Sequence, residues 1–415
     1  MVFSLSTIEL NAGADFDLLA HLPENPTSFI RGGQGIVGWG EALRLTATGP
    51  DRIGSLAKQW RELVSKFEIK DELRLPGTGL VAFGSIAFAD ESSAQSVLVV
   101  PKVILGTRDG RTWLTKVEDA SANDAAANGA AAIDFWLTEA TYDRNPSVEF
   151  RIGEHTPQEF RTAVRDAVEN IRAGKLEKVV LARDLVAELA PYFDLRPVLE
   201  RLAKKYPTCW VYSVDGMFGA SPELLVRVSH GQVSARVLAG TAGRGTDPGV
   251  DAAIATALAA SAKNTFEHAF AVDSLVQALA PFCSQVDADP KPFSLALPNL
   301  WHLASDVHGV LLESASVLDL AAALHPTAAV AGTPRLEAQK LLAELEDFDR
   351  GRYAGPVGWI GADGDGEWAI ALRGAQIEGR TVRAFAGCGI VEGSEPDAEL
   401  AETELKFAPM REALG

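Results

Sequence analysis

The stretch "GPVGWIGADGDGEWAIALRGAQIEGRTVRAFAGCGIV", residues 355–391, consists of short apolar runs separated by glycine-rich turns. Such runs predict strands that follow one another through tight turns. Two earlier stretches show the same pattern. "CWVYSVDGMFGAS" (209–221) has Asp-Gly between two apolar runs, and "ELLVRVSHGQVSARVLAG" (223–240) reads as a second hairpin. Because hairpins join antiparallel strands, these stretches predict a mostly antiparallel sheet.

Helical patterns lie between these hairpins. In "TPQEFRTAVRDAVENIRAG" (156–174), Thr156 and Glu159 form a capping box and Gly174 is a stop signal. Residues 249–282 are rich in Ala and Leu at helical spacing, and "PRLEAQKLLAELEDF" (334–348) predicts a further helix. The predicted class is therefore α/β of the α+β kind, with helices packed on antiparallel strands and no doubly wound parallel sheet.

The chain has 415 residues and a formal net charge of −18, with 47% hydrophobic and 23% charged residues. That acidity argues against a nucleic-acid partner, because there is no basic stripe to contact phosphates. The three cysteines, Cys209, Cys283 and Cys388, are far apart and form no CxxC motif, which fits a reducing compartment. We found no signal-peptide pattern and no long uncharged apolar run, so we expect a cytoplasmic protein with no membrane partner.

One segment interrupts this composition. "EDASANDAAANGAAAID" (118–134) has almost no large apolar side chain and predicts a loop. It separates a first portion, 1–117, from a longer portion, 145–415, and these need not be independent domains.

The literal GxGxxG at Gly33, Gly35 and Gly38 does not predict a dinucleotide site. The residues after it, "WGEALRLTA", read as a strand, and the position twenty residues on is Lys58, where an acid is required.

Two predicted helices carry acids that a solvated surface would also carry. In "DAELAETELK" (397–406), Glu399 and Glu402 are three residues apart and share a helix face, whereas Glu404 points away and is expected to be solvated. In "SAKNTFEHAF" (261–270), Asn264 and Glu267 have the same spacing. A carboxylate from each helix could form an oxygen-rich site for Mg²⁺.

Other single residues are ambiguous on their own. Lys178 at the start of "KVVLAR" is either a solvated lysine or, in a dry pocket, a general base. Glu223 of "SPELL" is either a surface residue or a general acid, and His302 of "LWHLASDV" is either a core residue or a pocket residue. "LAGTAGRG" (238–245) is a glycine-rich turn whose backbone N–H groups could bind a carboxylate.

Nine of these blocks occur in one order that resembles a known family, the chorismate-utilising enzymes. They are "EKVVLAR", "ASPELLVRV", "LAGTAGRG", "AKNTFEHAF", "NLWHLASDVHG", "LHPTAAVAGTPR", "FDRGRYAGPVGWIG", "IALRGAQI" and "FAGCGIVEGSEPDAELAETELK". The resemblance runs from about 150 to 408 and is weak before that. It implies a single large chorismate-binding fold with two mostly antiparallel sheets flanked by helices, and an Mg²⁺-dependent site.

The resemblance also implies a role for each matching residue. Lys178 would activate water and Glu223 would protonate the departing hydroxyl. Glu267 and Glu402 would bind Mg²⁺, supported by Glu399 and Asn264. The implied substrate-binding positions are Gly240, Thr241, His302, Tyr353, Arg373, Gly387 and Lys406.

Within the family, the residues favour isochorismate synthase, an isomerase that adds water at C2 of chorismate with loss of the C4 hydroxyl. Relatives that add ammonia usually lack the lysine at the position of Lys178, so no glutaminase partner is expected, and the chain should act as a monomer or weak homodimer. Salicylate synthase, which goes on to eliminate pyruvate, stays open: Tyr353 and Leu372 resemble that type, whereas Phe385 resembles the isomerase. An ammonia-using subunit is the other alternative. The product would feed menaquinone or siderophore biosynthesis.

Two residues depart from the family pattern. Asn264 stands where many relatives have an acid, and Cys388 stands where alanine is usual. We interpret Cys388 as a small buried thiol, because no base is predicted beside it.

Overall fold

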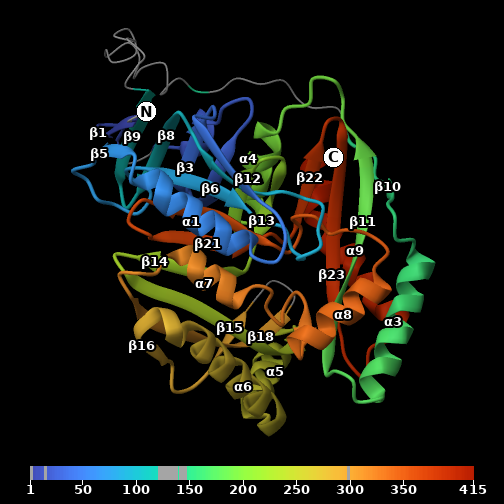
Figure 1. Cartoon of the computed structure of the whole chain (residues 1–415). Helices are drawn as coiled ribbons and strands as arrows, with labels where there is room; N and C mark the ends of the chain where they lie inside the picture. Colours follow the sequence, from blue (N-terminus) through green and yellow to red (C-terminus); the bar gives the residue numbers. More distant parts are fainter. Residues whose placement is uncertain (1–2, 14–15, 120–138, 140–146, 297–299) are drawn as a thin grey trace. The chain divides into compact units, whose positions relative to one another are not determined.

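The computed structural model describes residues 3–13, 16–119, 139, 147–296 and 300–415, and they divide into two compact units (Figure 1). Unit 1 contains residues 1–223, 325–362 and 369–415; unit 2 contains residues 224–324 and 363–368. The predicted 118–134 loop lies outside the described residues except for its first two, which end a strand.

Unit 1 carries a sheet of 13 strands within the described residues. Every pair in it is antiparallel except β1 with β5. Its hydrogen-bonded order is β10, β11, β23, β22, β13, β12, β2, β3, β8, β9, β1, β5, with β19 also on β11. The bounds are β1 Phe3–Leu10, β2 Thr27–Arg31, β3 Gln34–Trp39, β5 Phe67–Lys70, β8 Val103–Arg108, β9 Arg111–Asp119, β10 Arg151–Ile152, β11 Lys178–Glu188, β12 Trp210–Val214, β13 Met217–Ser221, β19 Gly332–Thr333, β22 Gly374–Glu378 and β23 Thr381–Ile390.

Unit 1 has further antiparallel strands outside that sheet, which pair as β20 with β6, β6 with β7, and β7 with β4. The bounds are β4 Leu43–Ala47, β6 Val81–Ser85, β7 Ser96–Val100 and β20 Pro356–Gly361. Its helices are η1 Leu18–His21, α1 Arg52–Val64, α3 Pro157–Arg172, α4 Arg196–Lys205, α8 Arg335–Leu345 and α9 Pro396–Leu414. β21, Gly366–Ile370, has residues in both units.

In unit 2, β18 is the strand on which the others assemble, because β15, β16 and β17 all pair with it in antiparallel register. β14 and β15 form the hairpin predicted at 223–240. The bounds are β14 Leu224–Ser229, β15 Gln232–Gly243, β16 Cys283–Ala288, β17 Phe293–Ala296, β18 Leu300–Leu311, α5 Pro248–Ala260, α6 Ala262–Leu279, η3 Ala280–Phe282 and α7 Val317–Leu324.

The predicted class is confirmed, with mixed helices and mostly antiparallel sheets. The GxGxxG stretch is strand β3 itself and is followed by strand β4, so the structure excludes a dinucleotide-binding turn there. α3 has the predicted capping box, in which the Thr156 hydroxyl accepts from the Glu159 amide and the Glu159 carboxylate accepts from the Thr156 amide. No described helix is long and apolar enough to cross a membrane.

The core of unit 1 positions the strands that carry the candidate site. Helix α9 buries Phe407, Met410 and Leu414, and these pack in one cluster with Leu185 of β11 and Ala384 of β23. Burying a side chain of this size stabilises a fold by ~1.5–3 kcal/mol. α9 is thereby fixed against β23, next to β11 and α3 (Figure 1).

Candidate functional site

The centre of the candidate site in unit 1 is the carboxyl group of Glu223, which follows β13. Its backbone is fixed on both sides: the Glu223 amide donates to the Ser221 hydroxyl at 3.2 Å, and its carbonyl accepts from the Ile370 amide at 3.0 Å. Burial raises the pKa of Glu223 above its ordinary value, although the charges of Lys178, Arg373 and Lys406 act in the opposite direction. The structure therefore brings four of the predicted residues together in unit 1.

Lys178 is the first residue of β11, and its side chain lies over the backbone of β23. A Cβ atom added at Gly389 would come within 2.7 Å of the lysine Cε atom. Glycine at that position leaves room for the lysine stem, and the positive charge of Lys178 acts on Glu223. General acid–base chemistry requires that each group reach the proton it transfers, and Lys178 is near enough to Glu223 for its charge to act on that carboxyl.

Arg373 lies between β21 and β22 with a backbone φ of +49°, in the left-handed region that few side chains other than glycine adopt. The strand β13 passes close by, because a Cβ atom at Gly219 would lie 2.6 Å from the Arg373 carbonyl oxygen. Backbone of this kind occurs at functional positions, but five other described non-glycine residues also have a positive φ, so the conformation alone does not single out Arg373. The guanidinium charge acts on Glu223, Tyr353 and Tyr212.

Tyr353 and Gly387 form one wall of the site in unit 1. The Tyr353 ring stacks on Phe385, with centroids 4.9 Å apart and planes at 12°. Burial raises the pKa of Tyr353 to about 12, so its hydroxyl is neutral and can donate a hydrogen bond near neutral pH. A Cβ atom at Gly387 would lie 3.4 Å from that hydroxyl oxygen, so glycine gives access to the backbone there.

Helix α9 carries three predicted residues. The Lys406 ammonium donates to the Gly387 carbonyl at 2.8 Å and lies 2.6 Å from the Glu402 carboxylate, whose side chain is 46% exposed. The Glu399 carboxylate accepts from the Ser394 hydroxyl at 2.6 Å. Burial raises the pKa of the Cys388 thiol well above its ordinary value, and the nearby charge of Glu399 acts in the same direction. Its interpretation as an inert buried thiol is therefore supported.

The sequence prediction for Glu404 on this helix holds for its exposure but misses its ion pairs. Glu404 was expected to be a solvated residue, but its carboxylate accepts a hydrogen bond from Arg183 at 2.6 Å and pairs with Arg411 at 2.7 Å. The Arg183 side chain is only 1% exposed. Glu404 points away from Glu402, as helix geometry predicted, and its side chain is 40% exposed while its carboxylate also pairs with a buried cation on β11.

The remaining predicted residues lie in unit 2. Gly240 has a φ of +84° and sits at a bulge in β15, between Leu238 and Thr241, where the pairing register with β18 shifts. Thr241 is opposite His302 in that pairing. A Cβ atom at Gly240 would lie 3.3 Å from Cβ of Asn264 on α6. The structure thus brings Gly240, Thr241, His302 and Asn264 together, and Glu267 follows Asn264 by one turn of α6.

Two features of unit 1 were not found from the sequence. Glu346 and Arg350 form an ion pair in which both side chains are almost fully buried, at 4% and 3% exposed. Their spacing of four residues was the available signal, but both residues lie past the end of α8, so helical spacing does not account for their contact. The other feature is a cavity of about 910 Å³.

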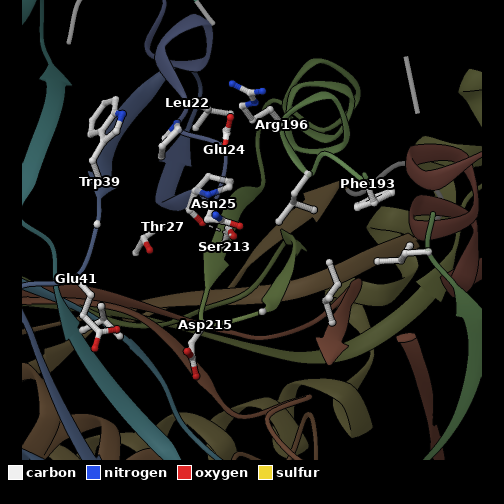
Figure 2. A pocket seen from close by; sticks show the side chains of 18 of the residues that line it. Leu22, Glu24, Asn25, Thr27, Trp39, Glu41, Phe193, Arg196, Ser213 and Asp215 are labelled. Atoms are coloured by element: carbon white, nitrogen blue, oxygen red, sulfur yellow. Dashed lines mark hydrogen bonds between the residues drawn. The ribbon is translucent and has the colours of Figure 1, made fainter. Parts of the chain in front are cut away.

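Figure 2 shows this cavity with Trp39 and Phe193 on opposite sides. Its polar lining includes Glu41 and Asp215, which both pair with Arg44. None of the described residues that line it belongs to the predicted site.

The described residues contain no cluster of three or more His, Cys, Asp or Glu side chains arranged to hold a metal. The oxygen ligands that Mg²⁺ prefers are nevertheless present on α9. Glu402 is accessible, and Lys406 balances its charge.

Comparison with known proteins relates this geometry to a family. The chain matches the family of chorismate binding enzymes over residues 9–415. It is 33% identical over 405 residues to the isochorismate synthase MenF of Bacillus subtilis, covering 92% of this chain and 85% of that protein. It is also 33% identical to the salicylate biosynthesis isochorismate synthase of Pseudomonas aeruginosa over 399 residues, or 91% of this chain and 82% of the relative.

Among solved structures, the fold is similar to MenF, the menaquinone-specific isochorismate synthase from Escherichia coli. The TM-score is 0.79 at 26% sequence identity, and the match covers 100% of this chain and 95% of the other. The similarity therefore extends over the whole chain, including the first portion, in which the sequence motifs are weak.

Proposed function

Because the chain belongs to the chorismate binding enzyme family, we propose that it is an isochorismate synthase, an isomerase that converts chorismate to isochorismate. The relatives over nearly its whole length carry that activity in their names. The observation that carries the proposal is the carboxyl of Glu223, whose pKa is raised by burial in a site that also holds Lys178, Arg373 and Lys406. A carboxyl that can act as an acid, a lysine that can act as a base and two further positively charged side chains suit the conversion of an anionic substrate.

In this proposal Lys178 is the general base and Glu223 the general acid. Lys178 takes a proton from a water molecule whose oxygen bonds to C2 of chorismate. The ring double bonds shift, the C4–O bond breaks, and Glu223 donates the proton with which the hydroxyl leaves as water. One water is consumed and one released, so the reaction is an isomerisation. The raised pKa of Glu223 favours the protonated form that this role requires.

Magnesium is the proposed cofactor, with Glu402 and Glu267 as ligands and Glu399 and Asn264 in support. The residues fit such an ion because carboxylate oxygens are hard ligands and Glu402 is accessible on α9. When bound, Mg²⁺ would neutralise negative charge on the substrate carboxylate. Within the chain, the Lys406 ammonium forms an ion pair with the Glu402 carboxylate.

The proposed substrate contacts follow from the donors of each unit. In unit 1, Arg373, Lys406 and the backbone at Gly387 would bind carboxylate, and the neutral hydroxyl of Tyr353 would donate a hydrogen bond. In unit 2, Gly240, Thr241 and His302 are further proposed substrate contacts. We further propose that the chain works without a glutaminase subunit, as a monomer or weak homodimer in the cytoplasm.

Salicylate synthase is the second candidate, because Tyr353 and Leu372 resemble that type. Phe385, on which the Tyr353 ring stacks, resembles the isomerase type, and the relatives named as isochorismate synthases favour the isomerase. An ammonia-using subunit is disfavoured by Lys178. The test is to incubate the purified chain with chorismate and Mg²⁺, without ammonia, and to identify the products. Isochorismate alone is the expected result, whereas equal amounts of salicylate and pyruvate would indicate the second candidate.

The pathway can be tested separately. The product would feed menaquinone or siderophore biosynthesis. A deletion strain that requires added menaquinone, or one that loses siderophore only, would assign the pathway.

A further inference from the structure

The outer edge of β11 has a gap in its strand pairing, and a buried ion pair fills it. One edge of β11 pairs with β23 from Val179 to Glu188. On the other edge, β19 pairs only with residues 178–179, and β10 only with residues 185–186. Between them, the Val180 amide donates to the Ala331 carbonyl and the Asp184 carbonyl accepts from the Gly153 amide, and we call the backbone from the Val180 carbonyl to Ala182 the 180–182 gap.

Two side chains take the place of a strand in this gap. Arg350 donates from Nη2 to the Val180 carbonyl at 2.6 Å, and the Glu346 carboxylate accepts from the Ala182 amide at 2.7 Å. Alternate residues of a strand direct their backbone groups to the same edge, so a carbonyl and an amide two residues apart need one donor and one acceptor. The ion pair supplies both.

The pair is itself held rigidly. The guanidinium makes a two-pronged contact with Glu346, at 2.7 Å from Nε and 2.6 Å from Nη2. The Arg350 Nη1 donates to the carbonyl of Val330, just before β19, at 2.9 Å. The Arg350 Cζ atom lies 4.4 Å from the centre of the Phe88 ring. A planar, bidentate guanidinium in a buried setting loses little freedom when it makes these contacts.

The same ion pair lies close to Lys178 and to the wall formed by Tyr353 and Gly387. Lys178 is two residues before Val180, a distance of about 7 Å along a strand. Ala182 is opposite Gly387 in the sheet, and the Tyr353 amide donates to the Arg350 carbonyl at 3.0 Å. The charges of both members of the pair act on the Tyr353 hydroxyl.

We propose that Glu346 and Arg350 are positioning residues, which fix the backbone of β11 at the 180–182 gap and thereby hold Lys178 in reach of the substrate. The proposal rests on the proposed isochorismate synthase activity and on the role of Lys178 in it. A buried ion pair is a weak source of stability, because desolvation offsets its attraction, so an explanation from stability alone is insufficient.

The deciding variant is the double substitution Glu346→Leu/Arg350→Met. Apolar side chains of similar size often replace a buried ion pair without loss of stability, but they cannot donate to Val180 or accept from Ala182. We expect a melting temperature within a few degrees of the parent chain and faster hydrogen exchange in the peptide spanning residues 178–186. We also expect kcat to fall by about 10- to 100-fold, since misplacement by ~1 Å can cost a factor of that order. A kcat equal to that of the parent chain would overturn the proposal.

Glu346→Gln keeps a neutral acceptor for Ala182 but loses the charged two-pronged contact with Arg350, so we expect a smaller fall in kcat, and it serves if the double variant does not fold. Combined with Lys178→Ala, it completes a double-mutant cycle. If the pair acts through Lys178, Glu346→Gln should cost little further kcat once Lys178 is gone. Independent, multiplicative losses would contradict the positioning role.

Asp90→Asn is the matched control. It removes the partner of another buried arginine, Arg52, whose hydrogen-bond acceptors are Asp90 and the carbonyls of Gly49, Ala87 and Phe88. We expect it to lower the melting temperature with kcat unchanged. Two measurements separate the two proposals. Unchanged hydrogen exchange in residues 178–186 of the double variant would refute the edge contact. A parent chain that makes no isochorismate would refute the proposed function.

Discussion

The ammonium of Lys406 lies 2.6 Å from the carboxylate of Glu402, one turn earlier on α9, and also donates to the carbonyl of Gly387 on β23. One side chain thus joins the helix that carries the proposed metal ligand to the strand that carries a proposed substrate contact. Because Lys406 neutralises Glu402 in the chain itself, a cation that binds this carboxylate must share it with the lysine.

Glu402→Ala should abolish Mg²⁺-dependent turnover, because the proposed site loses a charged ligand. The measurement is chorismate consumption over a titration of Mg²⁺. Asp397→Asn is a suitable control, since this residue lies in the first turn of the same helix and its side chain is 86% exposed. Equal losses from the two substitutions would contradict the role of Glu402.

Lys178→Ala should lower kcat by ~10²–10⁴-fold, the usual contribution of a general base. Chorismate should still bind with similar affinity, because the proposed carboxylate contacts come from other residues. Calorimetric titration with chorismate and a product assay measure the two effects separately. Lys175→Ala is the control. Lys175 lies three residues earlier and its ammonium donates to the Asn170 side chain, so this change should alter neither kcat nor chorismate affinity. Turnover of Lys178→Ala near that of the parent would exclude this lysine as the base.

Arg373→Gly should weaken chorismate binding by about 10- to 100-fold, the equivalent of one lost hydrogen bond to a charged group. The same change relaxes a backbone held at a φ of +49°, so the melting temperature should not fall. Arg74 has the same φ of +49° and lies elsewhere in unit 1, so Arg74→Gly is the matched backbone control. A variant of Arg373 that binds chorismate normally would remove it from the substrate site.

Local chemistry explains which elements could be predicted. The Asp215-Gly216 turn joins β12 and β13, and the Thr156 capping box starts α3, because both signals depend on a few neighbouring residues. Sheet order could not be predicted in this way. β11 pairs with β23 and β19, which lie far along the chain, and no local pattern specifies such partners.

The candidate site shows the same division. Lys178, Glu223 and Arg373 were found through motifs in which each residue stands at a fixed place. The contacts of Glu346, just after α8, and of Glu404 on α9 were missed because a glutamate in a predicted helix resembles a solvated residue in the sequence. Only tertiary packing reveals that Glu346 accepts from the Ala182 amide and that Glu404 pairs with the buried Arg183.

Glu223 and Glu404 should affect the pH dependence of stability in opposite directions. Burial raises the pKa of Glu223. Its stabilising contribution is therefore complete below the ordinary glutamate pKa, ~4.3, and is lost as pH rises through the folded value. For Glu404, burial alone would raise the pKa, but the hydrogen bonds from Arg183 and Arg411 lower it overall. Its contribution is present above ~4.3 and is lost as pH falls through the folded value.

Melting curves of Glu223→Gln, Glu404→Gln and the parent chain between about pH 3 and pH 7.5 test this pair. Relative to the parent, Glu223→Gln should gain stability as pH rises, because glutamine cannot ionise in the buried site. Glu404→Gln should be less stable than the parent at neutral pH, because the buried Arg183 then lacks a charged acceptor, and this deficit should shrink only as pH falls through the lowered pKa of Glu404. If the stability of the two variants depended on pH in the same way, the different surroundings inferred for Glu223 and Glu404 would be contradicted. Because Glu223 is the proposed acid, Glu223→Gln should also lower kcat by ~10²–10⁴-fold, whereas the loss in Glu404→Gln should be one of stability.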